Sequence, residues 1–468
     1  MTSGARRPLI LVIALVLLAS ACQQWPTMRG TPGNTGFNGS ETELSLADAG
    51  TVTEQFRADL GIIQEGWQSP VISGSTIYAP TAGGLGAFDL NGASGCSGTP
   101  TTCQPMWTGD VGGRQIGSAV AVSGWTVFVT AGLTADNRLF AFDIRGENGC
   151  AGTPVVCQPL WTAPDTWLAA PTVDGSTVYI INGDARVAAY DANGVTGCGG
   201  SPKVCAPLWT TTQVPTAAPI TAAIGGGKLF VSTFDDTIEA FDAHGIEGCG
   251  GSPKVCSSLW TGEVQGDPHF WPTSPVVSGD RVYLAMDEVD EDWMPVQPLR
   301  TIVAGFPLDG GGACTPSTGT GRSCQPAWSA SFDGTVQVNE AAAAYGKLYF
   351  QAAGVATPFP SQLVVIDTTD PGCSPGPCGP AWTSSIGPDA GQVSPIVANG
   401  VVYLDRSGSI QAVDANGVTG CSGTPKVCAS TTFSTFPGPY ASGSAISNGR
   451  LAVITFDAQE RFTLRVFG

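Results

Sequence analysis

Charge and histidine are scarce in this sequence. Only 12% of its 468 residues are charged, and it holds two histidines, His244 and His269. With so few histidines, no nucleophile–base pair of the kind that catalyses hydrolysis is apparent. Lys and Arg are outnumbered by Asp and Glu, 20 against 38, and they form no basic stripe. Because the phosphate backbone repels such a chain, nucleic-acid binding is excluded as a function.

Long helical patterns are missing as well. Helices need Ala, Leu, Glu and Lys on successive turns, whereas this chain has short runs of Val, Thr, Tyr and Phe. These runs are interrupted by many of the 63 glycines and 35 prolines. This composition predicts an all-β fold with many tight turns.

The longest apolar run lies near the N-terminus, at residues 9–21, after Arg6 and Arg7. Thirteen helical residues span about 20 Å, against roughly 30 Å of bilayer hydrocarbon, so the run indicates a signal peptide and not a membrane span. Residues 18–22, Leu-Ala-Ser-Ala-Cys, resemble a bacterial lipobox with its Leu one place early. In a lipobox the cysteine is acylated and becomes the mature N-terminus. The alternative is an ordinary cleaved signal with an incidental Cys22.

Three segments follow from this interpretation. Residues 1–21 are expected to be a lipoprotein signal peptide, residues 22–50 an anchor and tether, and residues 51–468 a single folded domain. Loss of Arg6 and Arg7 would change the formal net charge from −18 to about −20. The mature protein is therefore expected to be exported and held through Cys22 at the outer side of a bacterial membrane, in the cell envelope.

The cysteines support export. Besides Cys22 there are fourteen, which fall into seven close pairs. The pairs are Cys96/Cys103, Cys150/Cys157, Cys198/Cys205, Cys249/Cys256, Cys314/Cys324, Cys373/Cys378 and Cys421/Cys428. An even set in an exported chain predicts disulfides within each pair. Zinc is the alternative, but each pair supplies only two ligands and the usual spacing in zinc hooks is shorter.

A long phrase recurs around the cysteine pairs. Four copies are AFDLNGASGCSGTPTTCQPMWTGD, AFDIRGENGCAGTPVVCQPLWTAP, AYDANGVTGCGGSPKVCAPLWTTT and AFDAHGIEGCGGSPKVCSSLWTGE. The first cysteines of successive pairs lie 48 to 65 residues apart. A period near 50 in a strand-rich chain predicts the blades of a β-propeller.

A second element, a hairpin with glycine at its turn, occurs eight times. The turn glycines are Gly74, Gly124, Gly175, Gly227, Gly279, Gly346, Gly400 and Gly449. Glycine suits these turns because a tight hairpin needs positive φ. The hairpin count predicts eight blades, with seven blades as the fallback.

The seven cysteine loops leave one blade incomplete. Each blade comprises strands A and B (the hairpin), strand C (the AFD segment), the cysteine loop and strand D (the LWT segment). The last copy ends after strand C at residues 462–466, and residues 55–61 align with the D segment 106–112. We therefore expect residues 52–61 to be the outermost strand of the last blade and to close the ring.

Each D strand carries one large aromatic residue. These are Phe56, Trp107, Trp161, Trp209, Trp260, Trp328, Trp382 and Phe433. One large aromatic residue per blade is typical of packing between blades, since each ring can bury about 150–250 Å².

The AxD segment followed by Gly and Trp resembles the tryptophan-docking motif of the pyrroloquinoline-quinone (PQQ)-like propellers. The matching residues are Ala87/Asp89/Trp107, Ala141/Asp143/Trp161, Ala189/Asp191/Trp209, Ala240/Asp242/Trp260 and Ala412/Asp414. Asp367 keeps only the acid, and residues 305–307 depart from the motif. Residues 25–38 resemble the entry segment of such proteins. The resemblance covers residues 25–468 and implies an eight-bladed, quinoprotein alcohol dehydrogenase-like propeller.

The resemblance leaves several functions open. The family includes quinone-dependent dehydrogenases, with a vicinal Cys–Cys disulfide over PQQ and Ca²⁺ beside it, and cofactor-free lipoproteins similar to an outer-membrane assembly factor. Here no two cysteines are adjacent, so neither PQQ nor Ca²⁺ is expected. The predicted function is a non-catalytic binding or scaffold protein with an unidentified protein or cell-envelope partner. A carbohydrate or cell-wall binder is the second possibility, and a dehydrogenase the third.

A ligand site is expected where the chain departs from the repeat. Three tryptophans and one tyrosine precede A strands, at the mouth of the central channel, and a fourth tryptophan lies in a long acidic B–C loop. The candidate residues are Trp67, Trp167, Trp271, Tyr440 and Trp293. Asp287, Asp290 and Asp292 of that loop are weak candidate Ca²⁺ ligands, because they lack the spacing of a known Ca²⁺ loop. The alternative is that the aromatic residues cap blade edges and the acids are solvated.

Overall fold

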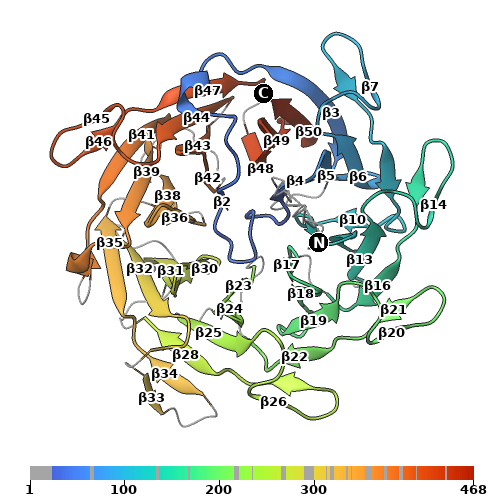
Figure 1. Cartoon of the computed structure of the whole chain (residues 1–468), viewed down its shortest axis with the longest axis horizontal. Coiled ribbons are helices and arrows are strands. Elements are labelled where there is room, and N and C mark those ends of the chain that lie inside the picture. The colour runs from blue at the N-terminus through green and yellow to red at the C-terminus, as the bar shows by residue number, and fades with distance from the viewer. Residues whose placement is uncertain are drawn as a thin grey trace, which may run out of the picture.

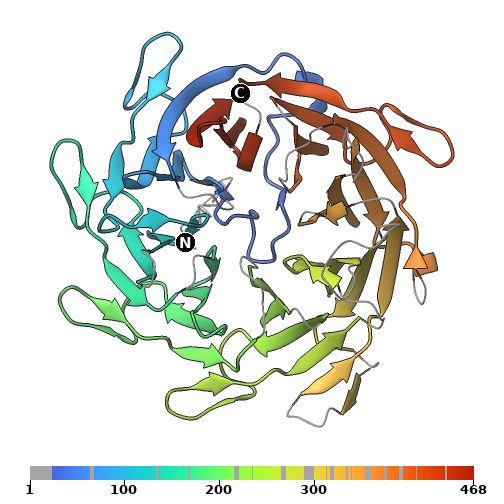
Figure 2. The ribbon, with the colours of Figure 1, turned by 180° about the vertical axis from the view of Figure 1, so that it is seen from behind.

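The computed structural model arranges the short β-rich runs into eight sheets around a central axis, as a β-propeller (Figures 1 and 2). In the inner strands consecutive residues are buried, as at residues 126–132, so both faces of the sheets are covered there. The structure describes residues 24–63, 68–132, 136–166, 169–214, 221–233, 236–264, 270–288, 300–311, 314–316, 321–333, 336–338, 340–353, 360–373, 377–388, 394–406, 408–437 and 440–468.

Four antiparallel strands form the body of each sheet, in the order A to D from the axis outward. The A strands are β4 (Val71–Ser73), β11 (Ala121–Ser123), β17 (Thr172–Asp174), β23 (Ala223–Gly225), β30 (Val276–Ser278), β37 (Ala342–Ala344), β42 (Ile396–Ala398) and β48 (Tyr440–Ser447). The B strands are β5 (Thr76–Thr81), β12 (Thr126–Gly132), β18 (Thr177–Ile181), β24 (Lys228–Ser232), β31 (Arg281–Glu288), β38 (Lys347–Ala353), β43 (Val401–Arg406) and β49 (Arg450–Phe456).

The outer half of each sheet is formed by the C and D strands. The C strands are β6 (Gly84–Asp89), β13 (Arg138–Asp143), β19 (Val187–Asp191), β25 (Thr237–Asp242), β32 (Arg300–Pro307), β39 (Pro360–Asp367), β44 (Ser409–Asp414) and β50 (Arg461–Phe467). The D strands are β9 (Trp107–Gly109), β16 (Trp161–Pro164), β22 (Trp209–Thr211), β28 (Trp260–Glu263), β35 (Trp328–Asp333), β41 (Trp382–Pro388), β47 (Thr431–Thr435) and β3 (Glu54–Ile62). Three short strands, β10 (Gln115–Ile116), β29 (Phe270–Pro272) and β36 (Val336–Val338), extend the pairing of B strands.

The two ends of the propeller differ in the connections they carry. The A–B turns and the C–D cysteine loops lie at one end, because each C strand finishes beside the start of its B strand; Asp89 pairs with Thr76, for example. We name this end the turn face. The B–C and D–A connections lie at the other end, which we name the loop face.

The predicted ring closure is present. β3 pairs antiparallel with β50 along its length, so the N-terminal part of the chain supplies the D strand of the last sheet. A partly buried ion pair joins the two strands, with Arg465 Nη1 2.7 Å from Glu54 Oε2. The expectation that this strand is outermost was wrong, because β8 (Thr102–Cys103) pairs with its outer edge.

The predicted disulfides are all formed, each within its own cysteine loop. Six loops are hairpins: β7 (Cys96–Ser97) with β8, β14 (Cys150–Ala151) with β15 (Val156–Cys157), β20 (Cys198–Gly199) with β21 (Val204–Cys205), β26 (Cys249–Gly250) with β27 (Val255–Cys256), β33 (Cys314–Pro316) with β34 (Arg322–Cys324), and β45 (Cys421–Ser422) with β46 (Val427–Cys428). The seventh contains a short 3-10 helix, η2 (Pro371–Cys373), and β40 (Pro377–Cys378).

Each cysteine loop extends the preceding sheet and not its own. Its second strand pairs in parallel with the D strand of the sheet before it, as β15 does with β9 and β21 with β16. In Figure 1 the hairpins project from the rim between neighbouring sheets. Through this pairing each loop covers the edge of a D strand and joins two adjacent sheets.

Replacing both Cys198 and Cys205 by serine is expected to lower the free energy of unfolding by about 2–3 kcal/mol, the chain-entropy value for so short a loop, while the fold is retained. Urea unfolding followed by circular dichroism would measure the loss, with the reduced wild-type protein for comparison. Non-reducing peptide mapping that linked cysteines of different loops would contradict the pairing on which this prediction rests.

The docking motif acts between sheets. The Asp that ends the C strand accepts backbone N–H groups of the loop after it; Asp191 binds Asn193 at 2.9 Å and Thr196 at 2.7 Å. Burial alone would raise the pKa of Asp191, but these N–H donors outweigh it and lower the pKa. The loop is thereby held so that Gly194 lies against the ring of Trp161 from the preceding sheet. This confirms the predicted inter-blade role of the D-strand tryptophans.

The expected tether at residues 22–50 was wrong for its described part, residues 24–50. β1 (Gln24–Trp25) pairs with β4, β2 (Phe37–Asn38) pairs with β42, and Trp25 is fully buried. The chain then passes through the 3-10 helix η1 (Leu46–Asp48) to β3, and the blue segment in Figure 1 follows this path through the centre of the ring. No helix among the described residues is both long and apolar enough to span a bilayer.

Part of this segment replaces the cysteine loop that the last sheet lacks. In other sheets the B-strand tyrosine donates its hydroxyl to a backbone carbonyl of the next C–D loop, as Tyr349 does to Ala415 at 2.9 Å. Tyr403 instead donates to the carbonyl of Leu44, at 3.2 Å. The N–H of Gly50 donates to Phe433 on β47, the D strand whose sheet ends without a hairpin. Residues 44–50 therefore cover this edge.

Candidate functional site

The centre of the ring is crossed at the turn face by residues 25–38. Their carbonyls accept N–H groups from the middle residues of successive A strands. The pairs are Val122 with Pro26, Ile224 with Pro32, Val277 with Gly33, Ala343 with Thr35 and Val397 with Gly36. The pairing of β1 with β4 connects these residues to the first sheet, and Asn38 Nδ2 donates to the carbonyl of Ile446 in the last sheet at 2.8 Å. Seven of the eight A strands are thus bound to one segment, which we name the central segment.

Positive φ angles let the central segment turn within the ring. Gly30, Asn34 and Gly36 have φ of 77°, 57° and 58°. A side chain at Gly36 would meet the guanidinium of Arg29, so this position needs glycine for space as well as for backbone conformation. The turns bring Arg29 and Asn34 into the axis, where both are buried.

Arg29 binds two other sheets from the axis. Its Nη2 donates to the carbonyls of Ala341 at 2.9 Å and Pro395 at 3.1 Å. Its Nε lies 3.6 Å from Oε2 of Glu340. Burial lowers the pKa of Arg29 to about 10, while Glu340 opposes this shift. The guanidinium remains charged at neutral pH and is neutralised by Glu340 within the protein.

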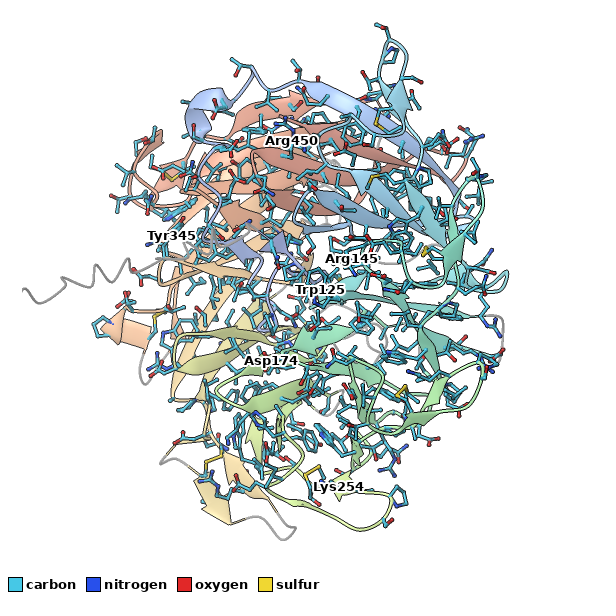
Figure 3. All side chains as sticks on the ribbon, turned by 45° about the vertical axis from the view of Figure 1, so that its right-hand side comes forward. Trp125, Arg145, Asp174, Lys254, Tyr345 and Arg450 are labelled. Atoms are coloured by element: carbon cyan, nitrogen blue, oxygen red, sulfur yellow. A yellow bond between two sulfur atoms is a disulfide. The ribbon has the colours of Figure 1, made fainter. Side chains whose placement is uncertain are left out.

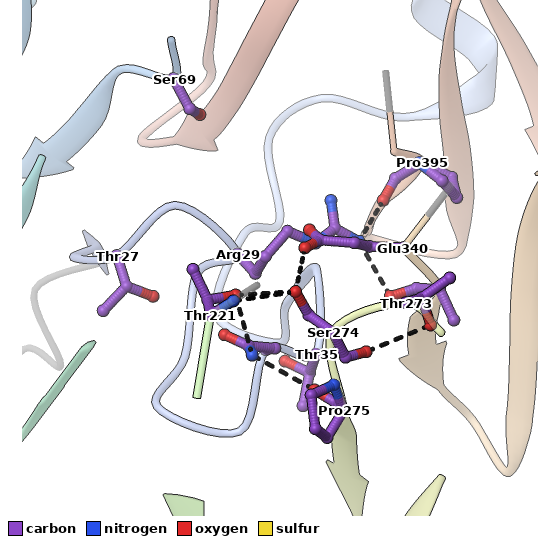
Figure 4. A network of polar contacts seen from close by, with 12 residues as sticks. Thr27, Arg29, Thr35, Ser69, Thr221, Thr273, Ser274, Pro275, Glu340 and Pro395 are labelled. Atoms are coloured by element: carbon purple, nitrogen blue, oxygen red, sulfur yellow. Dashed lines mark hydrogen bonds and ion pairs between the residues drawn. The ribbon is translucent and has the colours of Figure 1, made fainter. Parts of the chain in front are cut away.

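Glu340 continues the network into the fourth and fifth sheets (Figure 4). Ser274 donates its hydroxyl to Glu340 Oε1, and the N–H of Thr221 donates to Ser274 Oγ at 3.1 Å. Asn34 Nδ2 donates to the carbonyls of Ala222 and Pro275, both at 3.2 Å. Charged and amide groups on the axis are therefore bound chiefly to the protein itself.

A shallow hollow of about 280 Å³, counting the solvent at its mouth, lies beside Arg29 toward the loop face. It is lined by Met28, Arg29, Ser69, Ser394, Ile396, Ser442, Gly443 and Ser444. Four serines and one guanidinium are groups that hold a small polar ligand by hydrogen bonds. The described residues of this lining include no carboxylate, so they contain no general acid–base pair.

Asp405 lies behind this hollow, on β43. It is 5% exposed, and its Oδ2 accepts the hydroxyl of Ser444 at 3.3 Å. Burial raises the pKa of Asp405 to about 7, and the Ser444 hydrogen bond only partly opposes this. Asp405 was not among the predicted site residues, although an acid directly after the apolar run Val402-Tyr403-Leu404 is a signal that the sequence contains.

Asp405 should make stability depend on pH. Its folded pKa, about 7, exceeds the ordinary value of 3.8, so stability is expected to fall as pH rises between these values. Asp405→Asn should remove this dependence and raise the melting temperature near pH 8 more than near pH 4. Calorimetry at both pH values would measure the effect, with the exposed Asp174→Asn as control. Parallel pH profiles for wild type and Asp405→Asn would contradict the prediction.

The predicted aromatic mouth lies mostly outside the described residues. Trp67, Trp167 and Trp293 are not described, and Trp271 and Tyr440 are described only in the backbone, on β29 and β48. Among the weak metal candidates, Asp290 and Asp292 are likewise outside, while Asp287 is buried and accepts the hydroxyl of Thr301 at 2.6 Å. The described residues contain no group of three His, Cys, Asp or Glu suited to a metal ion.

Comparison with known proteins identifies the fold. No protein-family profile and no curated sequence matches the chain. Among solved structures, BamB from Moraxella catarrhalis aligns at 13% identity over 89% of this chain and 97% of that one, with a TM-score of 0.53. Quinohemoprotein alcohol dehydrogenase from Comamonas testosteroni aligns at 12% identity over 95% and 80%, with a TM-score of 0.58. The chain has the fold of the PQQ-like repeat propellers.

A europium-containing methanol dehydrogenase aligns similarly, at 11% identity over 95% of this chain and 98% of that one, with a TM-score of 0.55. By the resemblance described above, the dehydrogenases of this fold hold PQQ and a metal ion, with a vicinal disulfide over the quinone. In this chain the fourteen paired cysteines are separated by 5, 7 or 10 residues and lie in the C–D loops. The residues present therefore do not fit that cofactor arrangement.

Proposed function

We propose that this protein is an exported, lipid-anchored and non-catalytic binding or scaffold protein of the bacterial cell envelope, built as an eight-bladed propeller. The observation that carries the proposal is the central segment. Seven A strands bind this segment, and its one buried cation is paired with Glu340. The chain thus uses its axis at the turn face for its own assembly.

Two further features support this proposal. Seven disulfides are typical of a chain that matures in an oxidising compartment outside the cytoplasm. BamB shares the fold, and the likeness of this chain to the cofactor-free members of the fold favours a protein partner in the envelope. We propose no quinone and no Ca²⁺ for this chain; a dye-reduction assay with added PQQ and Ca²⁺ should therefore give no activity above background.

Cys22→Ser should move the protein from the membrane fraction to the soluble fraction, because it removes the only residue that the lipobox-like run offers for acylation. Fractionation of cells expressing each form, with metabolic labelling by a radioactive fatty acid, would measure this. Ser20→Ala, which keeps small residues before Cys22, is the matched control and should remain labelled and membrane-bound. A Cys22→Ser protein that stays in the membrane fraction would refute the anchor.

A further inference from the structure

Exposed apolar side chains gather on the turn face. Nine large apolar side chains are exposed among the described residues, and eight of them lie on this face or its hairpins. Those eight are Trp125, Val156, Val195, Val204, Ile246, Tyr345, Val418 and Val427. The ninth, Ile62, lies at the loop-face end of β3. The described part of the turn face thus carries eight exposed large apolar groups.

Three of these residues occupy one repeated position. Val195, Ile246 and Val418 each follow the docking glycine of a C–D loop, and they are 73%, 76% and 73% exposed. Their N–H groups donate to the Asp that ends the C strand, at 3.2, 3.0 and 3.1 Å. The backbone is therefore fixed while the aliphatic side chain remains in solvent, where it adds nothing to the packing of the propeller.

Trp125 is held in place although it is 70% exposed. It lies in an A–B turn, and the guanidinium of Arg145 is 5.0 Å from the centre of its ring (Figure 3). Arg145 is in turn 3.2 Å from Glu147. A tryptophan with one face against a cation and the other open is amphipathic, like the tryptophans that lie at membrane–water interfaces.

Lysines show the same distribution. All five lysines of the chain belong to the turn face: Lys228 and Lys347 begin B strands directly after A–B turns, and Lys203, Lys254 and Lys426 lie in cysteine hairpins. Lysine combines an apolar stem with a cation, so it suits a boundary between apolar and polar surroundings. In the three hairpins the ammonium donates to the carbonyl of the docking glycine, at 3.1, 3.2 and 3.3 Å, and so lies beside the exposed aliphatic residue. The arginines Arg145 and Arg450 add to the cations at this end (Figure 3).

The chain enters the propeller at the same face. Gln24 pairs with Ser73, the last residue of β4 before an A–B turn, and Trp25 pairs with Ile72 one step deeper. Two peptide bonds join Cys22 to Gln24, which limits their Cα separation to about 7.6 Å. A lipid on Cys22 would therefore start close to the turn face, without the long tether that the sequence suggested.

From these observations we propose that the turn face lies on the phospholipid headgroup surface of the membrane that holds the anchor. Trp125, Tyr345 and the three aliphatic residues contact the interface, and the hairpin lysines lie beside the aliphatic residues at the headgroup level. The inference rests on the proposed acylation of Cys22, and it directs the loop face, with the hollow beside Arg29, away from the bilayer. We assign a lipid surface to the turn face because an anchor on Cys22 would keep this face beside the membrane.

The orientation can be measured on the full acylated chain in phosphatidylcholine vesicles. Ser75→Cys places one free thiol on an exposed A–B turn, and Ile62→Cys places one on the loop face. Each thiol is labelled with a fluorophore, and a spin label on the lipid headgroups acts as quencher. Quenching at position 75 should be several-fold stronger than at position 62. Replacing Val195, Ile246 and Val418 by serine should weaken it, with unchanged circular dichroism because all three side chains are exposed.

Vesicle flotation separates the two proposals. Protein that floats, with equal quenching at both positions or stronger quenching at position 62, would overturn the docked orientation while leaving the anchor intact. Protein that fails to float would overturn the anchor, and the docked orientation with it. A difference in quenching that disappears in detergent micelles and returns in vesicles would support the bilayer surface as the occupant.

Discussion

Trp25→Ala is expected to lower the free energy of unfolding by about 3–5 kcal/mol, the range for truncating a buried tryptophan. Trp25 is fully buried in the core cluster that contains the closing strands, and its ring lies against Gly30. Truncation would leave a cavity at the axis, where the central segment meets the A strands. Removing residues 24–50 altogether should abolish cooperative unfolding, because seven A strands would lose backbone partners.

The matched control is the same substitution at Trp125. Because that side chain is 70% exposed, Trp125→Ala should change the free energy of unfolding by no more than about 0.5 kcal/mol. Urea unfolding followed by circular dichroism suits both variants, since the loss of a tryptophan does not dominate that signal. Equal stability of the two variants would mean that the central segment is not part of the folded unit.

The sequence allowed the ring and its closure to be predicted. The hairpin glycines, the AFD segment and the cysteine loop recur with a regular period, so each blade could be recognised from its neighbours. The alignment of residues 55–61 with 106–112 then located the missing D strand, which pairs with β50 as expected. These features follow from local patterns and from the number of repeats, and both can be read from a single sequence.

The partners of the cysteine loops could not be predicted in the same way. The outer pairing of β15 with β9 joins residues of two successive repeats, and every repeat offers the same short edge. The spacing of Cys150 and Cys157 defines the hairpin but contains no signal for the sheet against which it packs. Only the geometry of the ring, which places each C–D loop beside the previous D strand, decides the partner.

The central segment was misread for a compositional reason. Residues 26–42 are rich in Gly, Thr and Asn and contain few apolar residues, a composition typical of a linker. Their order comes instead from backbone hydrogen bonds to the A strands and from polar side chains such as Arg29 and Asn34. The partners Glu340 and Pro395 lie more than 300 residues away, so no local pattern links them to Arg29.

The candidate site was predicted only in part. Its aromatic members lie outside the described side chains, and two of its described polar members, Arg29 and Glu340, do not interrupt the repeat in a way that marks them. Asp405 occupies a B strand, at a position where the other copies have apolar or uncharged polar residues. The signal that distinguishes this residue is an acid inside a strand. The search for sites in loops that depart from the repeat could not find it.

Docking of each tryptophan on the next loop gives the second large expected effect. Gly194→Ala should lower the free energy of unfolding by about 2–5 kcal/mol, which combines the cost of a left-handed alanine with overpacking. Its φ is +64°, and an added Cβ would overlap Cδ1 of Trp161 from the preceding sheet. Because the loop is held by Asp191 and by its disulfide, it cannot easily move away from the ring.

Gly175→Ala is the matched control for this effect. Its φ of +55° is similar, but no other heavy atom lies within 4 Å of the position of an added Cβ. It should therefore show only the conformational cost, about 1–2 kcal/mol. Urea unfolding of both variants isolates the packing contribution as the difference between them. The double variant Gly194→Ala/Trp161→Ala should lose less free energy of unfolding than the sum of the losses of the two single variants, because the smaller side chain at position 161 removes the overlap. If Gly194→Ala and Gly175→Ala were equally stable, the tryptophan would not be docked on the loop, and neighbouring sheets would be held together by the cysteine hairpins and the core alone.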